Sequence, residues 1–118
     1  MATMKMPCAV SGGADKTEYG VTTYQATSGT QIIPSTIKAS AICCYIDNGT
    51  TGWGVIGAAF NSDGSQKSNY YGDTYNGGRF LPNEPTLTFV QNANNSISIT
   101  HPSSSIVGGG TMTWVIIP

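Results

Sequence analysis

The sequence has little charge: only 9% of its 118 residues are Asp, Glu, Lys or Arg. Five basic and six acidic residues give a net charge of −1, and the basic residues form no stripe, so nucleic-acid binding has no electrostatic basis. A run of about 18 apolar residues is also absent, which argues against a membrane partner. The polarity comes instead from Ser, Thr, Asn and Gln, together with 15 Gly, a composition typical of extracellular, secreted or virion β-proteins.

The opening residues, MATMKMPCAVSGG, lack the features of a signal peptide. Their apolar stretch is short, carries one Lys and is interrupted by Pro7, whereas a signal peptide has a continuous apolar core. We therefore expect the protein to be synthesised and folded in a host cytoplasm without a signal peptide, wherever it acts later.

Helical periodicity is absent, because windows of about a dozen residues contain Gly, Pro or β-branched clusters. Short strand-like segments recur instead, separated by turn sequences such as DNGTTG, NSDGSQ and NAN. At this length we expect one domain, residues 1–118. We predict an all-β fold, a single β-sandwich or compact barrel of about eight mostly antiparallel strands. The predicted strands cover residues 4–10, 18–26, 30–33, 36–47, 53–61, 86–91, 96–101 and 111–117.

No arrangement of catalytic residues is recognisable, so we expect no enzymatic activity, no cofactor and no metal. The single histidine, His101, precedes Pro102 at a strand end, without a nucleophile elbow or paired carboxylates. Cys43 and Cys44 are adjacent, so on a strand they point to opposite sides, and we predict reduced, buried thiols. The GxGxxG string at residues 52–57 lies inside a strand pattern with no helix after it, unlike a dinucleotide-binding motif.

The closing segment, residues 111–117, is apolar on both faces. Met112, Trp114 and Ile116 point to one side of a strand, and Val115 and Ile117 point to the other. Such a strand must lie inside a sandwich or be covered by a neighbouring subunit. Residues 53–60 are apolar on both faces in the same way. The side chains that we expect to act as core or interface anchors are Trp53, Ile56, Trp114, Ile116 and Ile117.

Residues 62–81, SDGSQKSNYYGDTYNGGRFL, have little strand pattern and are predicted to form a long loop. Tyrosine offers rigid amphipathic area, and Asn or Asp can hydrogen-bond the vicinal hydroxyls of a sugar. Three interpretations stay open: recognition of a glycan or host surface, packing against a sister subunit, or no specific role. The candidate recognition residues are Tyr70, Tyr71, Asp73, Tyr75, Asn76 and Arg79.

Two stretches carry a resemblance to a known group of proteins. The first, TSGTQIIPSTIKASAICCYID, resembles the opening of small tail-fibre, tail-tip and minor structural domains of tailed bacteriophages, in which a proline-led turn introduces a long strand. The second, SISITHPSSSIVGGGTMTWVIIP, resembles their ending, in which a Gly- or Ser-rich loop leads to a final strand with Trp. The resemblance covers residues 28–60 and 95–118. Two features are not part of the pattern of these phage domains: the adjacent cysteines Cys43 and Cys44, which lie within the first stretch, and the loop at 62–81.

The resemblance implies a virion structural protein rather than an enzyme: a tail-fibre head, a tail component or a capsid decoration. Such proteins are usually homo-oligomeric, so the implied partners are further copies of the chain, with a trimer favoured, and other virion proteins. The runner-up interpretation is a glycan-binding lectin or adhesin module that uses the loop at 62–81.

Overall fold

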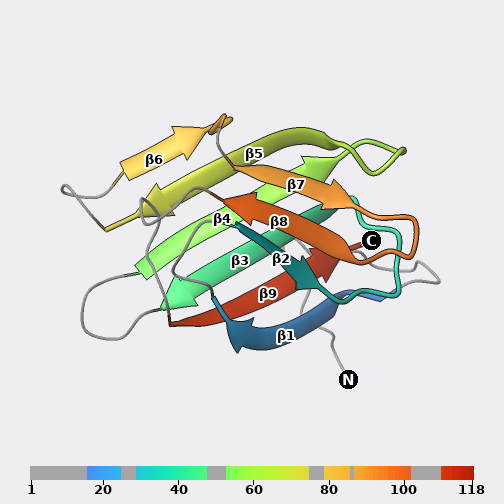
Figure 1. Cartoon of the computed structure of the whole chain (residues 1–118), viewed down its shortest axis with the longest axis horizontal. Helices are drawn as coiled ribbons and strands as arrows, with labels where there is room; N and C mark the ends of the chain where they lie inside the picture. Colours follow the sequence, from blue (N-terminus) through green and yellow to red (C-terminus); the bar gives the residue numbers. More distant parts are fainter. Residues whose placement is uncertain (1–15, 25–28, 48–52, 75–78, 86, 102–109) are drawn as a thin grey trace, which may run out of the picture.

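The computed structural model describes residues 16–24, 29–47, 53–74, 79–85, 87–101 and 110–118, so the strand predicted at 4–10 lies outside the described residues. The described chain is all-β, with nine strands in two antiparallel sheets (Figure 1). It contains no helix that could cross a membrane. The predicted sandwich is confirmed, and the alternative of a closed barrel is wrong, because both sheets are open. The strands are β1 (Glu18–Thr23), β2 (Gly29–Ile33), β3 (Ala41–Asp47), β4 (Trp53–Phe60), β5 (Gln66–Asp73), β6 (Arg79–Pro82), β7 (Thr88–Gln91), β8 (Ile97–His101) and β9 (Thr111–Ile117).

The larger sheet brings together strands that are far apart in the sequence. Its order is β1-β9-β3-β4-β5-β6, and all neighbouring strands are antiparallel. β9 therefore lies between β1 and β3, and its Trp114 stands opposite Gly20 on one side and Cys44 on the other (Figure 1). β9 is therefore an interior strand of the larger sheet, and its inward residues Met112, Trp114 and Ile116 belong to the core of the sandwich.

The smaller sheet, of order β2-β8-β7, covers one face of the larger sheet (Figure 1). Alternate side chains of each strand point into the space between the two sheets and form the core. Burial of each large apolar side chain there contributes about 2 kcal/mol to stability. The core side chains that are 0% exposed are Ile33, Ile42, Ile46, Ile56, Phe89, Ile97, Ile99, Met112 and Ile116.

Residues 34–40 cross from the smaller sheet to the larger one, and the long strand predicted at 36–47 therefore begins only at Ala41. The buried side chain of Gln91 holds this crossing. Its amide nitrogen donates to the carbonyl oxygens of Ile37 (2.8 Å) and Asn95 (3.0 Å), and its amide oxygen accepts from the backbone nitrogen of Ala39 (2.9 Å). The crossing thus obtains from one side chain the hydrogen bonds that a strand obtains from its neighbours.

The prediction of a long loop at residues 62–81 is wrong, because β5 and most of β6 lie in this stretch. The inward positions of β5 carry Asn69, Tyr71 and Asp73, so the core face of this strand is largely polar. The Asn69 amide nitrogen donates to the carbonyl oxygens of Leu87 (2.7 Å) and Glu84 (3.1 Å), and its oxygen accepts from the Glu84 backbone nitrogen (2.7 Å). Because few apolar side chains of β5 are buried, hydrogen bonds from its polar side chains help to hold it in the sandwich. A strand of this kind shows no alternation of apolar and polar residues, so the sequence pattern does not predict it.

Candidate functional site

The expected anchor residues lie inside the sandwich. Ile56 and Ile116 are fully buried and Trp114 is 8% exposed, all on the inward face of the larger sheet. Ile117 is also buried, although it points to the opposite side of β9. A single copy of the chain already buries these four residues, so they do not form an exposed interface. Ile56, Trp114 and Ile116 belong to the hydrophobic core. The side chain of Trp53 lies outside the described residues.

The candidate recognition residues do not form one surface. Tyr71 and Asp73 point into the core, where the Tyr71 hydroxyl donates a hydrogen bond to the Asp73 carboxylate. Tyr70 points to the opposite side of the strand, and its ring lies across Gly57, where an added Cβ would be 2.5 Å from ring atoms. The expectation of a shared recognition loop is thereby corrected, because successive residues of a strand face opposite sides. Outside the described residues lie Tyr75, Asn76 and the side chain of Arg79.

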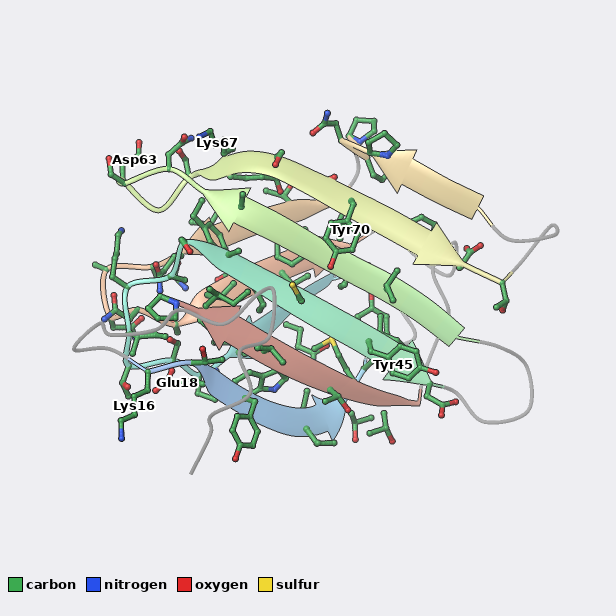
Figure 2. The ribbon with its side chains drawn as sticks, turned by 180° about the vertical axis from the view of Figure 1, so that it is seen from behind. Lys16, Glu18, Tyr45, Asp63, Lys67 and Tyr70 are labelled. Carbon is green, nitrogen blue, oxygen red and sulfur yellow. The ribbon has the colours of Figure 1, made fainter. Side chains whose placement is uncertain are left out.

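The larger sheet has a second face, turned away from the smaller sheet, which we call the outer face. Tyr19 is 78% exposed on it, Val21 66% and Tyr45 46%. Figure 2 shows Tyr45 and Tyr70 on this face, toward the viewer. Cross-strand pairing places its residues in two uncharged rows. One row is Val21, Thr113, Tyr45 and Val55; the other is Tyr19, Val115, Cys43, Gly57 and Tyr70.

Tyr19 and Val21 are not among the site residues predicted from the sequence. Their alternation with Gly20 and Thr22 is that of a half-buried strand, whose apolar side usually faces the core. In the structure the indole of Trp114 fills the inward side of β1, because a Cβ on Gly20 would lie 2.4 Å from its Cζ2 atom. The apolar residues of β1 therefore remain on the outer face. The signal that could have found them is this pairing of Trp with Gly, which becomes visible only once β1 and β9 are known to be neighbours.

A shallow cleft of about 380 Å³ lies beside β1, where residues 34–36 approach the edge of the larger sheet. Its polar wall is the Glu18 carboxylate, which accepts hydrogen bonds from the Ser35 hydroxyl (2.9 Å), the Thr36 backbone nitrogen (3.0 Å) and the Thr36 hydroxyl. These bonds, chiefly those from Thr36, lower the pKa of Glu18 and keep it anionic. The cleft thus combines a negative charge with aromatic surface. Its lining residues are Glu18, Tyr19, Pro34, Ser35, Thr36 and Trp114.

The substitution Glu18→Gln is expected to remove a pH-dependent part of the stability. Because folding lowers the pKa of Glu18 below its ordinary value of 4.5, its stabilisation is fully present above that pH and is lost as the pH falls through the folded pKa. Urea unfolding of both proteins over this acidic range should show their difference in unfolding free energy shrinking with acidification. A difference that stays constant with pH would contradict the assigned role of the carboxylate.

The described residues carry little reactive chemistry. Cys43 and Cys44 are free thiols whose side chains point to opposite faces, as their adjacency predicted. The prediction that both are buried holds for Cys44 and is wrong for Cys43, which is half-buried on the outer face. Burial raises the pKa of the Cys44 thiol, so it stays protonated near neutral pH. Within the described ranges, no three His, Cys, Asp or Glu residues lie close enough together to hold a metal ion. The side chain of His101 lies outside these ranges.

No protein-family model, no curated protein and no solved structure matches this chain. The resemblance to tailed-bacteriophage structural domains stays a prediction from the sequence pattern.

Proposed function

We propose that the chain is a non-enzymatic structural protein of a bacteriophage virion, a tail-fibre head, tail component or capsid decoration, that assembles with further copies of itself. The observation that carries the assembly is the outer face of the larger sheet. Three large side chains on it, Tyr19, Val21 and Tyr45, are 46–78% exposed. The virion assignment is supported by the sequence resemblance and by the low charge, which suits dense packing in a symmetric particle.

The chemistry of the outer face is that of a protein interface. Interface cores are depleted of charge and enriched in aromatic residues, and Tyr in particular is frequent among the residues that dominate binding. Among the described outward positions of β1, β9, β3 and β4, Asp47 carries the one charge, and it lies at the end of its strand. Figure 2 shows the charged residues Lys16, Glu18, Asp63 and Lys67 toward one end of the molecule, away from Tyr45. A second copy would therefore meet an apolar centre bordered by polar groups.

Light scattering over a concentration series tests this proposal. The wild-type chain should form a stable oligomer at micromolar concentration, and Tyr45→Ser should raise the concentration at which it dissociates at least about tenfold. The matched control is Ile32→Ser, which removes a 55% exposed side chain from the smaller sheet and should leave the oligomer unchanged. A wild-type chain that remains monomeric, or equal effects of the two substitutions, would contradict assembly through the outer face.

The alternative function, glycan binding, keeps one structural support. Tyr71 and Asp73 are buried, so binding by these two residues would require the core to open. The cleft beside β1 instead offers the exposed ring of Tyr19 next to the Glu18 carboxylate, a combination suited to stacking on a sugar and bonding its hydroxyls. A monomeric protein that binds on a glycan array, and loses binding in Tyr19→Ala, would favour this alternative over assembly.

A further inference from the structure

β1 lies at an end of the larger sheet, and within the described residues it pairs with β9 alone (Figure 1). Its other edge carries backbone groups that the register identifies. The Tyr24 nitrogen donates to the Gly110 oxygen (2.9 Å), so the even-numbered residues of this segment direct their N–H and C=O groups toward β9. The odd-numbered residues, Tyr19, Val21 and Thr23, therefore direct theirs away from the sheet. Of these, the Thr23 oxygen already accepts a hydrogen bond from the Gln31 side chain (2.8 Å).

The two edges of the larger sheet differ in how well they are protected against strand addition. Edge strands are usually prevented from pairing with strands of other molecules by Pro, by charged residues or by their short length. β6, at the far edge, has only four residues and contains Arg79 and Pro82. β1 has six residues, EYGVTT, without Pro, and its one charged residue, Glu18, stands at its start, where the carboxylate is bonded to Ser35 and Thr36. Two of its side chains, Tyr19 and Val21, are the most exposed large apolar groups of the described chain. Of the two edges, the one at β1 is therefore the less protected, chiefly at Tyr19 and Val21.

We infer that β1 pairs antiparallel with β1 of a second copy around a two-fold axis, joining two larger sheets into one. This inference rests on the proposed self-assembly and adds a contact between strand edges to the packing of the outer face. The most complete register places Val21 opposite Val21 of the second copy, with each Tyr19 opposite a Thr23. In this register the outward N–H and C=O groups of Val21 meet their equivalents and exchange two hydrogen bonds across the axis.

Side chains favour the same register. Val opposite Val, and Tyr opposite Thr, are pairs of β-branched and aromatic residues that stabilise antiparallel strands. Glu18 would stand opposite Tyr24 of the second copy, so no like charges meet within β1. The outer faces of the two copies become continuous, which extends the uncharged rows across the axis. The contact is two-fold, and it builds dimers or multiples of dimers in place of the trimer that the resemblance to phage structural proteins implied.

Hydrogen exchange at single-residue resolution separates this contact from packing through the outer face alone. In a monomer the amides of Gly20 and Thr22 are protected by β9, whereas those of Tyr19, Val21 and Thr23 exchange freely. Edge pairing should protect these three odd-numbered amides as the concentration rises. An oligomer in which they stay unprotected, or one that is a trimer, would overturn the edge contact and leave the proposed assembly intact. A monomer at every concentration would overturn both.

Introducing a charge at position 21 tests the two-fold register. Val21→Lys places two Lys side chains opposite each other at the axis and should weaken the dimer at least about tenfold, and Val21→Glu should do the same. A one-to-one mixture of the two variants should restore dimers as a mixed species. The control, Ile32→Lys on the smaller sheet, should dimerise like the wild type. Failure of the mixture to recover, when each variant alone is folded by circular dichroism, would overturn the register.

Discussion

Replacing Trp114 by alanine is expected to lower the free energy of unfolding by about 4 kcal/mol. The indole is 8% exposed and lies at the middle of β9, between Gly20 of β1 and Cys44 of β3. Its removal leaves a cavity that the surrounding sheet cannot fill, because Gly20 has no side chain and β9 is held by a partner strand on each side. A loss of this size takes away a large part of the stability of a domain of this length.

Urea unfolding at one fixed low concentration measures this effect, with Tyr45→Ala as the matched control. Tyr45 lies on the neighbouring strand but is 46% exposed, so its truncation should cost about 1 kcal/mol or less. The space over Gly20 provides a second check. Gly20→Ala alone should destabilise, since its Cβ would lie 2.4 Å from the indole, whereas in the Trp114→Ala background the same methyl should recover stability. Equal losses from Trp114→Ala and Tyr45→Ala would contradict the assigned packing.

Replacing Gln91 by leucine is expected to cost a similar amount, about 4 kcal/mol, although the new side chain is apolar and close in size. The amide of Gln91 satisfies the backbone nitrogen of Ala39 and the carbonyl oxygen of Ile37, both in buried hydrogen bonds. Leucine can bond neither group, and each buried backbone group left without a partner costs about 1–3 kcal/mol. The crossing between the two sheets at residues 34–40 should loosen in consequence.

The matched control for Gln91 is Gln66→Leu. The Gln66 amide oxygen also links strands, but it accepts one hydrogen bond, from the Phe89 nitrogen (2.9 Å), in a partly buried position. Its replacement should therefore cost about 1–2 kcal/mol. Hydrogen exchange should show faster exchange at Ala39 in Gln91→Leu and at Phe89 in Gln66→Leu. If Gln91→Leu were as stable as the wild type, the amide would not hold the crossing.

The strands that apolar patterning predicted are those whose burial is apolar. β3, β4 and β9 are largely apolar along both faces, and β7 and β8 alternate cleanly. Apolar patterning therefore predicts both ends of β4, β7, β8 and β9 to within about two residues, and the final residue of β3. β5 was missed because its inward positions carry the polar residues Asn69 and Asp73. The hydrogen bonds that satisfy Asn69 come from Glu84 and Leu87, which are more distant in the chain. The boundary at Ala41 was also missed, since it depends on where the chain changes sheets.

The candidate surface was less predictable than the fold. The sequence identified Trp114 and Ile116 as anchors, but whether they contact the chain's own core or another subunit depends on which strands lie beside β9. The exposure of Tyr19 and Val21 depends on the same information, because the indole from a strand far away in the sequence occupies the inward side of β1. Pairing between distant strands decides both points, and local periodicity does not report it.

The position of β9 between β1 and β3 has a consequence for the order in which the molecule is built. During synthesis β1 and β3 emerge long before β9, and in the finished larger sheet neither pairs with the other. Until β9 is made, β1 lacks the one strand with which it pairs in the described part of the chain, and β3 presents an open edge beside β4. The larger sheet therefore cannot be completed while translation is still upstream of Thr111, and in that interval nascent chains on neighbouring ribosomes offer one another the same unpaired strands.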